Sequence, residues 1–342
     1  MKSVLLTPTF LPKLTGNAVT VARITEHLEG GGITCRIIDL SVTHKGETLP
    51  QALSFQPDII HNFHAYKAGG TGLKLKEVLG IPMITTMTGT DLYADLKEHS
   101  RRKVILDVLR NSEGVTVFNE QARRLLCEQG IRPEGITVIH QSVRLPEGIS
   151  VDFRKCLQIG QSATVFLLLG SIRRVKDPGL ALGILEEVRK RSPGIHLIIA
   201  GSVMEEREFH KLRFWMEKPW VTYLGEVSRA HIRALLMSVD VVLNTSLSES
   251  ESNAVLEALS CRRIVLGRDI PGNASILTDE TGFMFRNRKE LYDQIIYIME
   301  NPDKLEAKRR KAEQLIKNGF SAQREKAEYL ALYRKCKYGP PL

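Results

Sequence analysis

An acidic segment stands beside an apolar helix pattern in the last third of the chain. Glu249 lies in a run of serines, and Glu257 follows among alanine, valine and leucine residues. We expect a strand over 241–244, a loop over 246–252 and a helix over 253–260. Carboxylates accept hydrogen bonds from sugar hydroxyls, and the first amides of a helix suit a diphosphate. The two glutamates are therefore spaced to hold neighbouring parts of one ligand.

The serines of this loop also have a purely structural interpretation. Serine is a good N-cap, so the loop 248–252 is explained equally well as a cap for the helix that follows. Capping does not explain Glu257, because a carboxylate on a buried helix needs a polar partner.

A basic loop after an apolar strand forms the second candidate site. The strand is expected over 165–169, and Gly170, Arg173 and Lys176 follow it. A guanidinium group binds phosphate through paired hydrogen bonds, and an ammonium group acts as a mobile point charge. Two ordinary surface cations are the alternative. That alternative is disfavoured, because cations near a helix N-terminus oppose the dipole unless an anion is bound.

Glycine-rich phosphate motifs are otherwise weak or absent. Neither the dinucleotide fingerprint nor the nucleotide triphosphatase loop occurs in the sequence. Gly16 follows the first expected strand and a proline-marked loop, and a helix is expected to begin near Asn17. A glycine there lets a ligand approach the helix N-terminus, although a tight turn explains it equally well.

The elements that must position these residues alternate between strands and helices. Short β-branched runs alternate with amphipathic segments, which is typical of parallel sheets covered by helices. The segment 144–161 lacks a clear period and carries proline and glycine, so we expect a linker there. The expected strands are 4–6, 35–38, 58–61, 83–86, 115–118 and 136–139 before the linker, and 164–169, 196–200, 221–224, 241–243 and 264–266 after it.

This organisation predicts an α/β chain with two doubly wound, Rossmann-like domains that face a central cleft. We place the first domain at 1–150 and the second at 160–319. In doubly wound sheets, ligands lie beyond the carboxyl ends of the strands. The acidic segment and the basic loop are both expected at such ends, in the second domain.

Composition and charge narrow the classes of function. The chain has 342 residues and a formal net charge of +9. No apolar run reaches the roughly 18 residues of a membrane span, and the N-terminus lacks a signal-peptide pattern. Five scattered cysteines without a CxxC pair indicate neither a disulfide framework nor a zinc site. We therefore expect a reduced, cytoplasmic protein.

The basic residues gather in three clusters, at 101–103, 308–311 and 334–337. Solvated helix faces are the favoured explanation, because glutamates interleave with the C-terminal clusters. Attraction to anionic substrates and a weak peripheral contact with a membrane stay open. A nucleic-acid partner is disfavoured, because the sequence has no aromatic-basic RNA motif, zinc finger or helix-turn-helix spacing.

Taken together, these motifs resemble the GT-B glycosyltransferases of family 4, retaining enzymes that move a sugar from a nucleotide-sugar. Glu249 and Glu257, with seven residues between them, are similar to the family's pair of glutamates. The basic loop 170–176 is similar to its phosphate loop. Further matching segments are 269–273, 281–285 and 320–333, the last of which resembles a helix that crosses back onto the first domain.

The resemblance implies a GT-B fold in which 320–342 belongs with the first domain. It implies that Arg173 and Lys176 grip the donor diphosphate and stabilise the departing nucleoside diphosphate, typically the largest catalytic contribution. Glu249 would hold the donor sugar, and Glu257 would accept the ribose hydroxyls. With this charge in place no divalent ion is required, so neither a metal nor a cofactor is expected. Retention would proceed by attack on the same face, assisted by the departing phosphate.

The remaining donor contacts implied by the resemblance come mainly from backbone. Amides of Ser250-Glu251-Ser252-Asn253 would lie near the sugar and phosphate. The loop Gly225-Glu226-Val227 would flank the base, and Gly16 would admit the β-phosphate.

The sequence departs from the family pattern in two places. Thr88 precedes Gly89 where the family often has a histidine that helps to orient the sugar, which puts acceptor geometry or activity in question. His64 is a candidate for the same cleft wall, although a lone histidine in a loop is more often structural. Asp91 is the expected polar group on the acceptor side. Glu251 stands in place of part of a glycine-phenylalanine-glycine run and adds negative charge where a phosphate is expected.

Narrower resemblances leave rival functions open. The Arg-x-x-Lys-Asp-Pro pattern and the Ser-Glu-Ser run resemble the glycosyltransferase 1 domain-containing subgroup, and 88–93 is similar to selenosugar synthases. A catalytically silent nucleotide-sugar-binding protein and sugar transfer to sulfur or selenium are therefore the alternatives. An NAD-dependent oxidoreductase is disfavoured by the missing glycines. The base, the sugar, the acceptor and the oligomeric state stay open.

Overall fold

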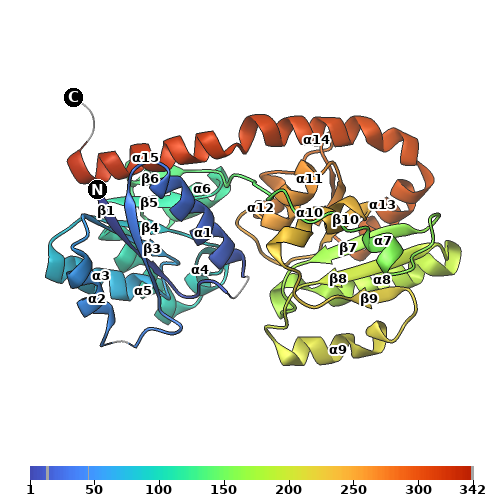
Figure 1. Cartoon of the computed structure of the whole chain (residues 1–342), viewed down its shortest axis with the longest axis horizontal. Helices are drawn as coiled ribbons and strands as arrows, with labels where there is room; N and C mark the ends of the chain where they lie inside the picture. Colours follow the sequence, from blue (N-terminus) through green and yellow to red (C-terminus); the bar gives the residue numbers. More distant parts are fainter. Residues whose placement is uncertain (13–14, 45, 340–342) are drawn as a thin grey trace. The chain divides into compact units, whose positions relative to one another are not determined.

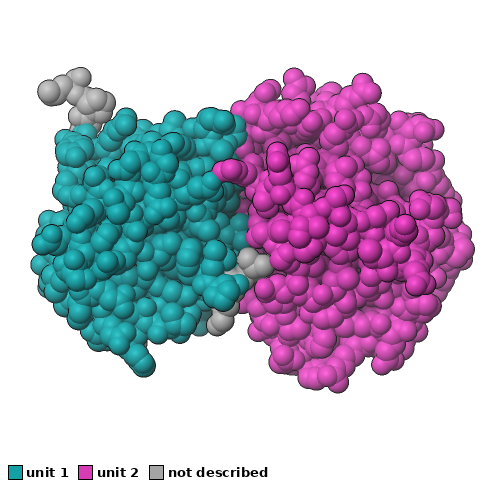
Figure 2. Space-filling model, viewed as in Figure 1, with its two compact units in different colours: residues 1–142, 321–342 teal, residues 143–320 magenta. Residues whose placement is uncertain are grey.

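The computed structural model describes residues 1–12, 15–44 and 46–339. Its contacts divide the chain into two compact units (Figure 2). Unit 1 comprises Met1–Ser142 and Ser321–Leu342, and unit 2 comprises Val143–Phe320. Residues 143–150 are thus counted with unit 2. Each unit contains a six-stranded parallel sheet with helices around it, which confirms the predicted fold class.

Unit 1 has the strand order β2-β1-β3-β4-β5-β6, and every neighbouring pair is parallel (Figure 1). All of its strands lie at the places expected from the sequence. The strands are β1 (Lys2–Thr7), β2 (Thr34–Asp39), β3 (Ile59–Phe63), β4 (Met83–Thr86), β5 (Gly114–Val117) and β6 (Ile136–Val138). The helices are α1 (Gly16–Glu29), α2 (Thr48–Phe55), α3 (Gly69–Leu79), α4 (Thr90–Tyr93), α5 (His99–Arg110), α6 (Glu120–Glu128) and α15 (Ala322–Tyr338).

The two faces of this sheet are covered by different helices, because successive side chains of a strand point in opposite directions. Val4 and Leu6 of β1 pack into a core that includes residues of α3 and α5. Leu5, between them, packs into a second core with residues of α1 and α15. Burial on both faces explains why the strands read as continuous apolar runs.

The C-terminal helix α15 is fixed to unit 1 by a buried carboxylate. Glu325 accepts hydrogen bonds from Arg23 Nε at 2.9 Å, from the backbone N–H of Ser142 at 2.9 Å and, at 3.0 Å, contacts His27 Nε2. Burial alone raises the pKa of this carboxyl. The Arg23 charge and the hydrogen bonds outweigh burial and hold the pKa of Glu325 at about 2. The residue is fully buried, so this network fixes how α15 lies on α1.

Unit 2 has the strand order β12-β11-β10-β7-β8-β9, again parallel throughout. The expected strands are present, and the sequence analysis missed the edge strand β12. The strands are β7 (Thr164–Leu169), β8 (Ile195–Ala200), β9 (Val221–Tyr223), β10 (Val241–Asn244), β11 (Ile264–Arg268) and β12 (Phe283–Phe285). The helices are α7 (Phe153–Cys156), α8 (Pro178–Arg191), α9 (Glu206–Met216), α10 (Arg229–Met237), α11 (Asn253–Ser260), α12 (Pro271–Ala274), α13 (Arg288–Glu300) and α14 (Leu305–Gly319).

Each sheet reverses its strand order once. In unit 1 the reversal lies between β1 and β3, and in unit 2 it lies between β7 and β10. The loops that leave two such strands run to opposite sides, which leaves a crevice at their carboxyl ends. Ligand sites are therefore to be sought at these two positions.

Candidate functional site

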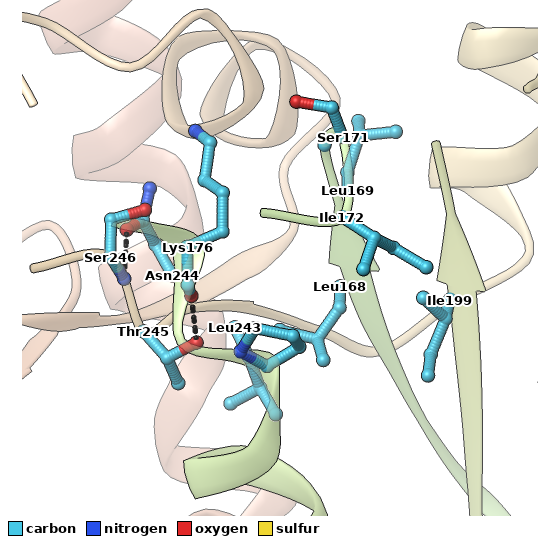
Figure 3. A pocket seen from close by; sticks show the side chains of 12 residues that line it. Leu168, Leu169, Ser171, Ile172, Lys176, Ile199, Leu243, Asn244, Thr245 and Ser246 are labelled. Atoms are coloured by element: carbon cyan, nitrogen blue, oxygen red, sulfur yellow. Dashed lines mark hydrogen bonds between the residues drawn. The ribbon is translucent and has the colours of Figure 1, made fainter. Parts of the chain in front are cut away.

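The candidate site of unit 2 lies at the carboxyl ends of β7 and β10. A solvent-open hollow of about 370 Å³ is present there. Figure 3 shows Lys176, Thr245 and Ser246 on one side of it and the apolar side chains of Leu168 and Ile199 on the other. A mainly apolar wall with a few polar groups opposite is the usual make-up of a small-molecule site.

The basic loop leaves β7 through Gly170. This glycine has a φ of +149°, which side-chain-bearing residues rarely adopt. Its Cα faces the Lys176 side chain, since a Cβ added there would stand 3.5 Å from Lys176 Cε. The glycine thus lets the chain turn out of the strand directly beside the lysine.

Lys176 and Glu249, predicted separately from two loops, are in contact. Lys176 Nζ forms an ion pair with Glu249 Oε1, which also accepts a 2.8 Å hydrogen bond from Ser246 Oγ. Burial raises the pKa of Glu249, but the Lys176 charge, the two hydrogen bonds and the Arg173 charge hold it below its usual range. Thr245 Oγ1 also donates to the Lys176 carbonyl at 2.8 Å. The loops after β7 and β10 are therefore joined by side chain and backbone.

Arg173 has an unused donor beside this pair. Its residue is half-buried and its Nε is buried, with no hydrogen-bond partner among the described residues. A buried guanidinium donor without an acceptor is unfavourable, so an anion placed there would gain a charge-assisted hydrogen bond. Arg173 also lowers the pKa of Glu249, so the two charges are near each other.

The start of α11 is held in place by packing as well as capping. Ser252 is the N-cap residue, and its hydroxyl accepts a 3.0 Å hydrogen bond from Asn244 Nδ2 of β10. A Cβ on Gly272 would lie 2.4 Å from the Glu249 carbonyl oxygen and 2.6 Å from that of Ser250. Only glycine therefore allows α12 to approach the acidic loop this closely.

The third acid of the loop is not directed freely into solvent. Glu251 is 5% exposed, and its neighbours Ser250 and Ser252 are also buried. Asn253, the first residue of α11, is half-buried. The loop 250–252 thus places its backbone close to the helix N-terminus.

Glu257 has the polar partner that its burial requires. The residue is 5% exposed, and its Oε1 pairs with Arg229 Nη1 at the start of α10. Arg229 Nη2 also donates to the Arg144 carbonyl at 3.2 Å. The sequence analysis missed Arg229. The partner is 28 residues away in the chain, and no local spacing identifies it.

The loop after β9 reaches the same edge of the sheet. The backbone N–H of Gly201, which follows β8, donates to the Gly225 carbonyl at 2.7 Å. Glu226 is exposed and Val227 half-buried. The loops after β7, β8, β9 and β10 therefore share one edge, and the predicted donor-site residues of unit 2 lie on them or on α11.

In unit 1, Asp91 is occupied by backbone groups. Its carboxylate accepts hydrogen bonds from the N–H groups of Ala65, Thr88, Gly89 and Leu92, at 2.8 to 3.3 Å. The residue is fully buried. This carboxylate joins the loops after β3 and β4, which makes it a positioning residue.

His64 lies beside Asp91 with an unusual backbone conformation, φ +83°. Its Nδ1 accepts from the backbone N–H of Lys67 at 3.3 Å, so the ring proton lies on Nε2 and is donated to Thr90 Oγ1 at 2.9 Å. Burial lowers the pKa of His64 and keeps the ring neutral. Gly16 lies elsewhere in unit 1, as the first residue of α1, with open space next to its Cα.

Within residues 1–12, 15–44 and 46–339, three or more His, Cys, Asp or Glu side chains nowhere gather in an arrangement suited to a metal ion. No helix of this described part has the length and apolar character that crossing a membrane requires.

Comparisons with known protein families give two matches. Residues 152–320 match the family model described as glycosyl transferases group 1. Residues 41–145 match the model described as glycosyltransferase family 4. The chain is 28% identical to the glycosyltransferase 1 domain-containing protein 1 of Xenopus tropicalis, over 93% of this chain and 94% of that one. It is 26% identical to the D-inositol 3-phosphate glycosyltransferase of Paenarthrobacter aurescens, over 68% of this chain and 62% of that one.

Solved structures share the fold at low sequence identity. HepE of Anabaena, solved in complex with UDP and glucose, has a TM-score of 0.81 at 17% identity and covers 98% of this chain and 100% of its own. Sucrose-phosphate synthase of Thermosynechococcus elongatus has a TM-score of 0.81 at 17% identity, covering 98% and 99%. These likenesses confirm the GT-B fold, with two parallel six-stranded sheets.

Proposed function

The chain belongs to the group 1 glycosyltransferases, and we propose that it moves a sugar from a nucleoside-diphosphate sugar to an acceptor with retention of the anomeric configuration. UDP is the nucleotide proposed, because a relative with the same fold was solved with UDP and glucose. The donor would occupy the hollow at the carboxyl ends of β7 and β10.

One observation carries this proposal: Lys176 and Glu249 meet at the strand-order reversal of unit 2, beside a hollow and the start of α11. A nucleotide-sugar has a dianionic diphosphate between two groups rich in hydroxyls. The site offers cations for the first and carboxylates for the second, in adjacent loops. Chance placement of two surface charges does not account for a pair at this position.

The roles of the charged residues follow from their chemistry. Arg173, with its unused Nε donor, and Lys176 would bind the diphosphate and stabilise the charge that develops on it as the glycosidic bond breaks. Because Lys176 is paired with Glu249, donor binding would draw the ammonium towards phosphate and leave the carboxylate for sugar hydroxyls. Glu257, held by Arg229, would accept from the ribose hydroxyls. The amides at the start of α11 add further donors for phosphate.

No divalent ion is required in this scheme. The leaving diphosphate would be neutralised by two side-chain cations and a helix N-terminus. Transfer and donor hydrolysis are therefore expected to proceed at the same rate with and without EDTA.

Binding and turnover of UDP-glucose test the proposal in two steps. Bound ligand raises the melting temperature by mass action, so a screen of nucleotide-sugars identifies the donor. Release of UDP is then measured for the unchanged chain and for Lys176→Ala and Glu249→Ala, with Lys190→Ala on the exposed face of α8 as the control. We expect losses of about 10²–10³-fold for Lys176→Ala, the usual cost of removing one group that stabilises developing charge.

Two results would count against the proposal in different ways. Tight binding of nucleotide-sugars without transfer or hydrolysis would identify a catalytically silent binding protein. Absence of binding to every nucleotide-sugar would remove the donor site itself.

A further inference from the structure

Unit 1 contains a buried carboxylate oxygen that its own contacts leave unused. Asp95 begins the short 3₁₀ turn Asp95–Lys97 after α4 and is 5% exposed. Its Oδ1 accepts a 2.7 Å hydrogen bond from Arg101 Nη1. Its Oδ2 has no hydrogen-bond partner among the residues that the structure describes. Such an oxygen is costly to bury, because the hydrogen bonds it made to water are not replaced.

The groups around this oxygen are fixed in a particular hydrogen-bonding sense. His64 Nε2 is 3.6 Å from Asp95 Oδ2, too far for a hydrogen bond, and donates instead to Thr90 Oγ1 at 2.9 Å. The histidine cannot turn this proton elsewhere, because its Nδ1 already accepts from the backbone N–H of Lys67. Thr90 Oγ1 therefore acts as the acceptor towards His64, and its own hydrogen is left to donate.

This pattern selects one kind of ligand group. Asp95 Oδ2 needs a donor, and the hydrogen of Thr90 needs an acceptor. A hydroxyl group supplies both, whereas an ammonium group only donates and a phosphate dianion only accepts. The Asp91 carboxylate, 3.8 Å from His64 Nδ1, adds a second negative charge that disfavours anions.

We infer that Asp95 Oδ2 and Thr90 Oγ1 form a hydroxyl-binding subsite in unit 1, oriented by His64, which takes a hydroxyl of a neutral polyol or sugar. The inference rests on the proposed function in one respect, that the bound hydroxyl belongs to the acceptor. Binding itself can be measured without donor or transfer.

The test is a titration of the imidazole signals of His64, which are identified by their loss in His64→Gln. The probes are glycerol, myo-inositol, methylammonium chloride and inorganic phosphate, added separately to the full chain. At least one polyol is expected to shift these signals saturably, and methylammonium and phosphate are expected to leave them unchanged. If no polyol gives a saturable shift, the oxygen binds water only and the inference is wrong. A saturable response to phosphate or methylammonium would contradict it equally.

Variants locate the binding to the named atoms. Asp95→Asn can place an amide N–H₂ where Oδ2 stood, so the polyol dissociation constant is expected to rise at least tenfold. Asp107→Asn, the same change at an exposed position of α5, is expected to leave it unchanged. Thr90→Val should weaken binding and Thr90→Ser should preserve it, which keeps the test decisive if Asp95→Asn folds poorly. Unaltered polyol affinity in both Asp95→Asn and Thr90→Val would overturn the assignment.

Failure of this subsite is distinguishable from failure of the donor site. Asp95→Asn is expected to bind UDP-glucose with the affinity of the unchanged chain in calorimetry. Polyol binding without UDP-glucose binding would contradict the proposed function and leave the subsite standing. The reverse outcome would remove the subsite alone.

Discussion

Replacing Lys176 by methionine should destabilise unit 2 in a pH-dependent way. The lysine side chain is 21% exposed and its partner Glu249 only 13%, so removal of the lysine leaves a mostly buried carboxylate with a single hydroxyl donor, Ser246. Hydrogen bonds to charged groups contribute about 1.5–3 kcal/mol, and we expect a loss of stability in that range at neutral pH. Glu249→Gln should cost less, about 1 kcal/mol, because the remaining ammonium can turn towards water.

The sign of the pH dependence follows from the pKa of Glu249. In the unchanged chain this pKa is held below the usual value of 4.5, so the carboxylate contributes stability above about pH 4.5 that is lost as the pH falls through the lower folded-state value. Without Lys176, burial raises the pKa of the carboxyl instead, and its ionisation opposes folding. The stability deficit of Lys176→Met should therefore be largest at pH 7 and shrink below pH 4.5.

Urea unfolding followed by tryptophan fluorescence measures this deficit in the correct unit. Both tryptophans, Trp215 and Trp220, lie in unit 2. Lys190→Met on α8 serves as the matched control. The double variant Lys176→Met with Glu249→Gln should recover part of the lost stability, with a coupling of about 0.5–3 kcal/mol, but no sugar transfer. A deficit that does not vary with pH, or a double variant that regains turnover, would refute the reasoning.

Three further predictions concern the buried acids and one close glycine contact. Glu257→Ala should weaken UDP binding about tenfold or more in calorimetry, because a charged acceptor for the ribose is lost, and Arg229→Ala should lower the unfolding midpoint of unit 2 by leaving that acid unpaired; unchanged UDP affinity in the first variant would remove the ribose role. Glu325→Gln should destabilise unit 1 by about 3–5 kcal/mol and flatten its acid unfolding between pH 4.5 and about 2, measured by hydrogen exchange of α15; an exchange pattern equal to that of the unchanged chain would contradict the network. Gly272→Ala should cost about 1–3 kcal/mol and reduce donor binding, since its Cβ would strike the carbonyls of the acidic loop, whereas Gly179→Ala, with open space in α8, should be neutral or slightly stabilising; equal melting temperatures for the two would show that the contact is relaxed.

Much of the fold could be predicted because strand burial leaves a direct record in the sequence. The strands expected at 83–86 and 164–169 have those bounds in the structure, since both are short apolar runs between helices. The edge strand β12 was missed, because Phe283–Phe285 is short and only partly buried. The strand order, and therefore the place where it reverses, depends on long-range pairing that no local pattern records.

The candidate site was predictable residue by residue but not contact by contact. Lys176 and Glu249 were each identified from chemistry and position after a strand, and only the adjacency of β7 and β10 brings them together. The partner of Glu257 was required by burial, yet its identity as Arg229 follows from tertiary packing alone. Asp91 was expected on chemical grounds to face an acceptor. Its carboxylate instead serves the backbone of two loops, which sequence spacing does not reveal.

The position of the diphosphate in a crystal structure of this chain with UDP-glucose tests the central claim most directly. The account predicts phosphate oxygens within hydrogen-bonding distance of the Arg173 guanidinium and Lys176 Nζ, at the start of α11, with Glu249 on the sugar side. A nucleotide bound away from the carboxyl ends of β7 and β10, with the Lys176–Glu249 pair undisturbed and Arg173 Nε still unpartnered, would contradict it.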